Sequence, residues 1–182
     1  MFRENRWLLI YGQKLADPDL MRISLNMAKP PRNMRTEHEK GSDEIAVFFR
    51  FLKEANLPVA PESVEKRVPP EPDLVCVHAS EGAVAFELVE LCDPNLARAF
   101  AKADDGYIRT SDPSARIVAK KLRRKYRTTL PLELLCYTAG RIITPDNVIL
   151  PTIKPFLRSW RHTFRRAWLL GRKGVYPIWR WE

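Results

Sequence analysis

The most regular pattern of apolar and polar positions lies at residues 69–93, which read PPEPDLVCVHASEGAVAFELVELCD. Two apolar runs, at residues 74–78 and 83–91, flank the turn-forming residues 80–82, and this pattern predicts a β-hairpin. Strands that are apolar on both faces are typical of a sheet that is covered on both sides. We therefore expect a central sheet that lies between layers of helices.

Apolar positions at helical spacing predict helices on either side of this hairpin. Residues 42–56 carry one such stripe, and Ser42 is the expected N-cap. Residues 114–127 carry another stripe, and their remaining positions are mostly basic. The other predicted elements are a short helix at residues 96–103, a strand at 130–138, a helix that starts at 144–146, and a C-terminal hairpin at 166–179.

This order of elements indicates a single mixed α/β domain. We divide the chain into an irregular lead-in at residues 1–41, which packs on the domain, and one α/β domain at residues 42–182. The sequence holds no apolar run long enough to span a membrane, and the apolar run near its start is too short for a signal peptide. Its three cysteines lie in apolar runs, which is typical of reduced, buried thiols. We therefore expect a cytoplasmic protein.

Charge is distributed unevenly along the chain, whose formal net charge is +9. Residues 1–40 sum to +3 and residues 41–112 to −7, whereas residues 113–182 sum to +13. A strongly basic surface either attracts polyanions or only keeps the protein soluble, and charge alone does not decide between the two. On the first interpretation we expect nucleic acid as the partner, DNA ahead of RNA, and no membrane partner. A homodimer is also compatible with the sequence. The residues expected to bind nucleic acid are Lys120, Lys121, Arg124, Lys125, Arg165 and Arg166.

Three acidic residues stand out in the hairpin because its strands are otherwise apolar. A carboxylate is costly to bury in a sheet unless it is paired or binds a cation. If His78 pairs with Gly82 around a three-residue loop, Asp73 lies opposite Glu87, and Glu90 points to the other face. A register shifted by one residue would instead place Glu90 on the face of Asp73. We favour the first register.

Facing carboxylates supply the hard oxygen ligands that Mg²⁺ or Mn²⁺ prefers. Asp73, Glu87 and Glu90 therefore form a candidate metal site, in which Asp73 and Glu87 are the principal ligands. The sequence has no GxSxG motif, no glycine-rich phosphate loop and no HExxH motif, so it does not support other catalytic classes.

The order of these features resembles the PD-(D/E)xK nuclease-like superfamily. A helix with an early glutamate is followed by a PD dipeptide that opens a strand, by a hairpin, and by an acid on the second strand. The residues that carry the resemblance are Glu44, Pro72-Asp73 and Glu87-Leu88-Val89. The resemblance implies a restriction-endonuclease-like αβββαβ core, followed here by a C-terminal hairpin.

The resemblance also implies a Mg²⁺-dependent nuclease that hydrolyses phosphodiester bonds. Asp73 and Glu87 would be its catalytic metal ligands and Glu44 an accessory ligand. The family's lysine, two residues after the second acid, is Val89 here. The basic helix would have to supply that charge, and we name Lys121 as the catalytic lysine. The other candidates in the same helix are Lys120 and Lys125.

Two further interpretations stay open. In one, the chain is an inactive nuclease-like protein that binds nucleic acid through its basic C-terminal third. In the other, it is an interaction module whose hairpin acids are structural and pair with arginines of that third. The acidic middle and the basic end would then neutralise each other within the fold, and the remaining surface charge would serve solubility.

Overall fold

A six-stranded mixed sheet forms the centre of the computed structural model, which describes residues 9–10, 13–14, 37–102 and 112–180. The strand order is β3-β4-β5-β6-β7-β8. Strands β5, β6 and β7 are parallel to one another, and all other neighbours are antiparallel. The bounds are β3 (Glu65–Lys66), β4 (Leu74–His78), β5 (Gly82–Glu90), β6 (Leu132–Tyr137), β7 (Phe164–Leu170) and β8 (Val175–Arg180).

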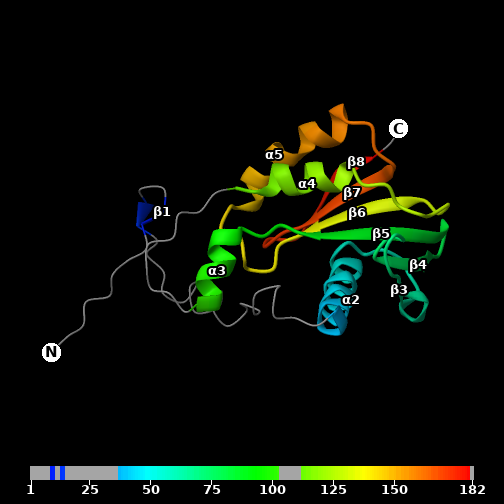
Figure 1. Ribbon diagram of the computed structural model, residues 1–182. Helices are drawn as coiled ribbons and strands as arrows, with labels where there is room; N and C mark the ends of the chain where they lie inside the picture. Colours follow the sequence, from blue (N-terminus) through cyan, green and yellow to red (C-terminus); the bar gives the residue numbers. More distant parts are fainter. Residues whose placement is uncertain (1–8, 11–12, 15–36, 103–111, 181–182) are drawn as a thin grey trace.

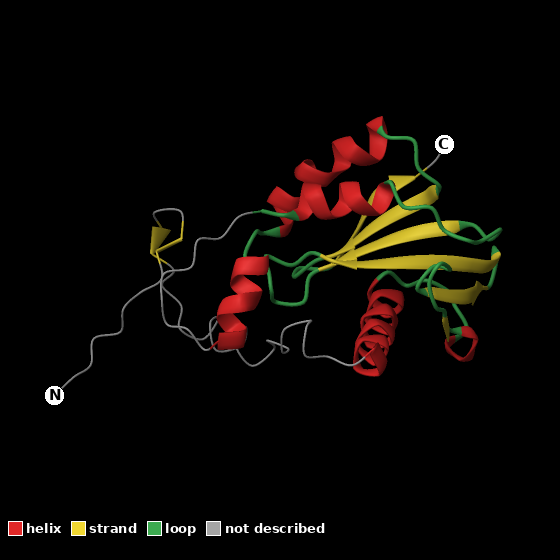
Figure 2. Ribbon diagram, in the orientation of Figure 1, coloured by secondary structure: helices red, strands yellow, loops and turns green. Residues whose placement is uncertain are grey.

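Helices cover both faces of this sheet, as Figures 1 and 2 show. Helix α2 (Glu37–Glu54) lies on one face, and α4 (Ser114–Leu122) and α5 (Asp146–Ser159) pack together on the other. The short α3 (Pro94–Lys102) follows β5, and a turn of 3-10 helix, η2 (Pro61–Ser63), precedes β3. The predicted mixed sheet between helices and the C-terminal hairpin β7–β8 are confirmed. The narrower prediction of a restriction-endonuclease-like core is not confirmed.

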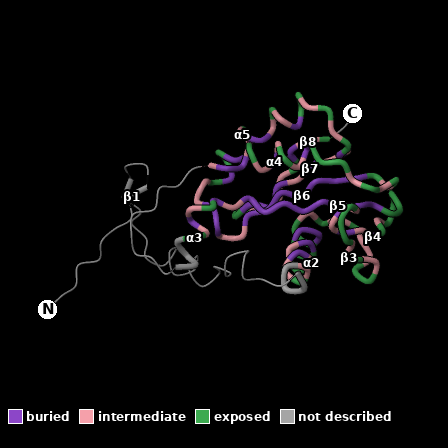
Figure 3. The backbone as a smooth tube through the Cα atoms, in the orientation of Figure 1, coloured by how far each residue is buried: buried purple, intermediate pink, exposed green. Residues whose placement is uncertain are grey.

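Two clusters of buried apolar side chains fill the spaces between the sheet and its helices. On one face, Phe48 and Phe51 of α2 pack against Phe86 of β5, with ring centroids 4.9 and 5.9 Å apart. On the other face, Val118 of α4 lies in a cluster with residues of α5. Residues 84–90 of β5 are all buried (Figure 3). This burial on both faces explains the nearly continuous apolar run in the sequence.

Among the predicted helix bounds that differ from the structure are the start of α2 and the end of α4. Helix α2 begins at Glu37, so Ser42 lies inside the helix and the prediction that it is the N-cap is wrong. Helix α4 ends at Leu122, whereas the prediction extended it to residue 127. Four of the next five residues are cationic, and like charges one helical turn apart destabilise a helix.

Within the predicted lead-in, β1 (Leu9–Ile10) pairs antiparallel with β2 (Gln13–Lys14). The rest of it, up to residue 36, lies outside the described residues, so the division of the chain at residue 41 stays a prediction. Among the described helices, none has the length and the apolar composition needed to cross a membrane. Cys76 and Cys136 are buried, as predicted, whereas Cys92 is half-buried.

Candidate functional site

The hairpin register brings Asp73 next to Glu87, as the favoured prediction states. His78 pairs with Gly82, so Asp73, which immediately precedes β4, lies opposite Glu87 of β5. Oδ2 of Asp73 accepts a hydrogen bond from the backbone N–H of Leu88 at 2.8 Å. This bond holds the Asp73 carboxylate against β5.

Glu87 is buried, with a side chain that is 1% exposed, and α4 supplies its counter-charge. Lys121 forms an ion pair with Glu87 and donates a second hydrogen bond to the carbonyl oxygen of Leu88 at 3.2 Å. Nη1 of Arg124 lies 3.5 Å from the same carboxylate. Burial raises the pKa of Glu87 and the charge of Asp73 raises it further, while Lys121 and Arg124 offset part of this rise.

Helix α4 determines which lysine reaches this carboxylate. Val89, at the position where the resemblance required a lysine, is buried in the apolar cluster beneath α4. Of the three candidate lysines, Lys121 makes the contact, because it lies one turn beyond the buried Val118 on the edge of the apolar stripe. Lys120 and Lys125 are exposed.

A second ion pair adjoins the first on the side of α2. Glu44 of α2 is 4% exposed and pairs with Lys66 of β3. Nζ of Lys66 also lies 3.9 Å from Oδ1 of Asp73, so this lysine stands between two acids. Lys66 is not recognisable from the sequence, because a two-residue strand in a proline-rich connection has no readable period.

Tyr126 adds a phenol to this group of charges. Its ring packs edge-to-face on Phe164 at 5.6 Å, and the Arg124 guanidinium lies 5.4 Å from its ring centroid. Its hydroxyl is buried and lies near the carboxylate of Glu87. Burial, and after it the charge of Glu87, raises the pKa of Tyr126 well above its ordinary value. The phenol therefore stays protonated, a property that its place in an apolar helical stripe did not reveal.

Glu90 does not belong to this group. It pairs with Arg141, whose Nε donates to Oε1 at 2.7 Å and whose Nη2 donates to Oε2. Both side chains are 3% exposed. Because Arg141 engages both carboxylate oxygens, a metal ion would have to displace that guanidinium to reach Glu90, and the role of Glu90 as a metal ligand stays a prediction.

The four predicted metal ligands do not converge. Within residues 37–102 and 112–180, no group of three or more His, Cys, Asp or Glu side chains is arranged to hold a metal ion. Glu44 and Glu90 each have a cationic partner instead. The pair of Asp73 and Glu87 remains as the part of the predicted set that the register brings together.

Cations of the C-terminal third neutralise the acids of the hairpin within the fold. This is the internal charge complementarity that the interaction-module interpretation expects. Arg165 and Arg166, which were predicted to bind nucleic acid, form ion pairs of this kind on the α2 face of the sheet. The pairs are Glu81 with Arg165 and Arg166, Glu87 with Lys121 and Arg124, and Glu90 with Arg141.

The internal pairs leave much of the positive charge of residues 113–182 on the surface. Exposed cations of α4, of the segment after it and of the end of α5 have no acidic partner among the described residues. Arg123 lies 4.4 Å from the ring centroid of Trp160 and so connects the end of α4 to the end of α5. We name this set the α4/α5 surface; it comprises Arg116, Lys120, Arg123, Lys125, Arg127, Arg158 and Arg161.

No family model and no curated protein matches this chain. The fold is similar to the solved structure of a protein of unknown function from Pseudomonas aeruginosa that is described as belonging to the monooxygenase superfamily. The two chains are 17% identical, the match covers 91% of this chain and 87% of the other, and the TM-score is 0.47. At this TM-score the likeness assigns neither that superfamily nor its activity to this chain.

The matched structure is described with the monooxygenase superfamily and not as a nuclease, so the comparisons lend no support to the predicted resemblance to the PD-(D/E)xK superfamily, and that prediction is withdrawn. The predictions of a nuclease and of phosphodiester hydrolysis are corrected accordingly. What remains of the candidate site is its geometry: a buried cluster of paired acids and cations around Asp73 and Glu87, and a basic surface over α4 and α5.

Proposed function

We propose that this protein binds nucleic acid through the α4/α5 surface. The observation that supports the proposal is that the stretch of chain that carries these cations contributes no exposed acid. Residues 113–161 contain two acidic residues, Glu133 and Asp146, and both are buried. Ordinary soluble surfaces intersperse charges of both signs. A surface of one sign instead attracts a polyanion and releases its counterions.

The arrangement of the cations also suits a nucleic-acid backbone. Arg116 and Lys120 are one helical turn apart on α4, and Arg158 and Arg161 lie at the end of α5. The stacking of Arg123 on Trp160 makes the two groups continuous. Lysine and arginine side chains of this kind contact phosphates, which positions a protein on nucleic acid without reading its sequence. Binding would therefore depend strongly on salt and weakly on sequence.

A variant with four cations of the α4/α5 surface replaced by glutamine tests the proposal. The changes are Lys120→Gln, Lys125→Gln, Arg158→Gln and Arg161→Gln. Affinity for a fluorescent DNA duplex is measured by anisotropy between about 50 and 200 mM salt. Each lost phosphate contact lowers the slope of log affinity against log salt by about 0.9, so the slope should fall by about 3 to 4.

A matched control removes four described cations elsewhere: Arg50, Lys53, Arg67 and Arg98. Both variants change the net charge from +9 to +5. The control should keep most of the affinity and the salt slope. Equal weakening of the two variants would mean that net charge alone governs binding, and unchanged affinity in the first would place any binding surface elsewhere. An RNA duplex of the same length, run in parallel, tests the preference for DNA.

A second candidate function is the binding of Mg²⁺ or Mn²⁺ by Asp73 and Glu87. Asp73 raises the pKa of Glu87, so the two negative charges lie close enough to repel each other. Oδ1 of Asp73 has its nearest cationic contact at 3.9 Å. Two carboxylates completed by water are a common ligand set for Mg²⁺, so these residues fit the ion. Lys121 competes with it for Glu87.

Calorimetric titration with Mn²⁺ tests this second candidate. Asp73→Asn should abolish the binding heat, whereas Lys121→Met should increase affinity because it removes the competing ammonium group. Glu71→Gln, which alters an acid close to Asp73 in the sequence, is the control and should bind as the unaltered protein does. Equal loss in the Asp73 and Glu71 variants, or no binding by any of these proteins, would contradict the site.

A further inference from the structure

A bulge in β7 turns two consecutive arginines to the same face of the sheet. Leu132 of β6 pairs with Phe164 and the next residue, Glu133, pairs with Arg166, so Arg165 is the extra residue of the bulge. In a regular strand, neighbouring side chains alternate between the two faces. A bulge places two residues opposite one and re-aims their side chains. Arg165 and Arg166 therefore both reach Glu133.

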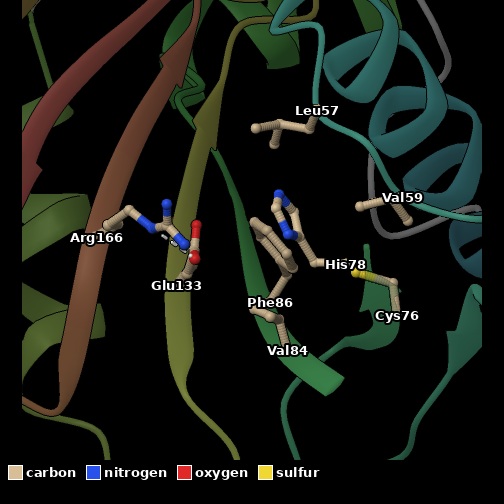
Figure 4. A pocket seen from close by; sticks show the side chains of 8 residues that line it. All are labelled: Leu57, Val59, Cys76, His78, Val84, Phe86, Glu133 and Arg166. Carbon is tan, nitrogen blue, oxygen red and sulfur yellow. Dashed lines mark hydrogen bonds and ion pairs between the residues drawn. The ribbon is translucent and has the colours of Figure 1, made fainter. Parts of the chain in front are cut away.

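Glu133 anchors the inner side of both guanidinium groups. It is 2% exposed and accepts hydrogen bonds from Nε of Arg166 at 2.8 Å and from Nη2 of Arg165 at 2.8 Å. Nε1 of Trp168 donates to its other oxygen at 2.7 Å. Figure 4 shows Arg166 of β7 directed at Glu133 of β6, next to a small apolar pocket. The buried carboxylate thus fixes the orientation of both arginines.

The outer side of the same guanidinium groups faces an open hollow. Arg165 and Arg166 each direct an Nη2 group to Glu81, which lies on the exposed turn between β4 and β5. The hollow has a volume of about 470 Å³ and is lined by Glu81, Arg165, Arg166 and Arg180. We call it the arginine hollow.

Arg180 leaves the arginine hollow with unbalanced positive charge. It lies directly opposite Arg166 on β8, and like charges opposite each other on neighbouring strands are destabilising. Among the described residues, no acid pairs with Arg180. Three arginines therefore face two carboxylates, Glu81 and the buried Glu133.

We propose that the arginine hollow binds a compact phosphate-class oxyanion, either inorganic phosphate or the head group of a phosphate monoester. Guanidinium groups recognise such oxyanions through paired, charge-assisted hydrogen bonds. The oxyanion relieves the repulsion between Arg166 and Arg180, and it competes with Glu81 for the outer Nη2 groups. Glu81 can yield its place because it sits on an exposed turn and its side chain is 27% exposed.

This site goes beyond the proposed nucleic-acid binding and is independent of it. Glu133 shares a sheet face with Phe86, its partner on β5, and Phe86 packs against α2. The arginine hollow therefore lies on the α2 face, whereas α4 and α5 cover the opposite one. A variant can alter one site and leave the other intact.

Isothermal titration of the full chain with inorganic phosphate tests the proposal, at about pH 8 and with ionic strength held constant by sodium chloride. Phenyl phosphate, titrated separately, represents a monoester. Arg180→Gln should weaken phosphate binding about tenfold or more, since it removes hydrogen bonds to a charged group. Glu81→Gln should strengthen it, because the competing carboxylate is gone. Arg158→Gln removes one charge from the α4/α5 surface and should leave phosphate binding unchanged.

Tighter binding of phenyl phosphate would assign the site to a monoester, and equal binding would assign it to the phosphate group alone; both support the proposal. It is overturned if phosphate gives no heat beyond that of chloride at the same ionic strength. It is also overturned if Arg180→Gln and Arg158→Gln bind phosphate equally well, or if Glu81→Gln does not strengthen binding. DNA binding by Arg180→Gln, measured in the same preparations, should be unaffected.

Discussion

The buried pair of Glu90 and Arg141 offers a direct test of how this fold accommodates charge. The two side chains are joined by a bidentate contact and are each 3% exposed. Arg141→Met removes the cation and leaves the Glu90 carboxylate in the interior without its partner. The double variant Glu90→Leu, Arg141→Met replaces both charges with apolar side chains of similar size.

The burial of this pair sets the expected magnitudes. Removing one partner of a buried ion pair costs about 3 to 5 kcal/mol, out of a total stability of about 5 to 15 kcal/mol for a domain. Arg141→Met should therefore lose a large fraction of the free energy of unfolding. The double variant should be clearly more stable than Arg141→Met, because it leaves no charge unpaired. Glu54→Gln, which breaks the exposed pair with Arg50, should cost no more than about 1 kcal/mol.

Urea unfolding followed by circular dichroism measures these differences, and a constant slope with denaturant shows that the unfolding reaction itself has not changed. Two results would refute the reasoning. One is a loss below about 1 kcal/mol in Arg141→Met. The other is a double variant no more stable than that single variant. Either would mean that Glu90 retains access to solvent.

Three further predictions concern titration, reactivity and packing. Burial raises the pKa of Glu87 above its ordinary value of 4.5, so the folded state holds a proton that the unfolded state has released. Stability, measured as the urea midpoint of unfolding, should fall as pH rises from 4.5 through the folded pKa. Glu87→Gln should flatten this dependence on pH, and an unchanged dependence would refute the assignment. Burial raises the pKa of Cys136 to about 12, so little of this thiol is in the reactive thiolate form. An alkylating reagent should therefore label the half-buried Cys92 first, as measured by mass spectrometry, and equal labelling of the two would contradict this. A methyl group on Gly171 would collide with the Asp146 carboxylate, so Gly171→Ala should lower stability by about 1 to 3 kcal/mol. Alanine at the single glycine of α2 is the control and should not lower stability. Equal melting temperatures of the two variants would count against this packing.

Much of the fold could be read from local sequence patterns, because the physical causes are themselves local. A three-residue loop and strict side-chain alternation determine the hairpin register, so the sequence placed Asp73 opposite Glu87 correctly. The apolar run of β5 correctly indicated a sheet covered on both faces. The start of α2 and the end of α4 were harder to predict, because capping and charge repulsion there compete with the same apolar stripe.

The sequence by itself thus determined the longer elements, the hairpin register and the excess of positive charge in the C-terminal third. Which charges meet was decided by tertiary structure alone. Lys66 reaches Glu44 across 22 positions of the chain, and Arg141 reaches Glu90 across 51. A motif of acids cannot distinguish a metal ligand from a paired carboxylate, because the difference lies in the cation that packing places beside each one. Burial makes that placement decisive, since an acid inside the fold must have a counter-charge or lose its proton.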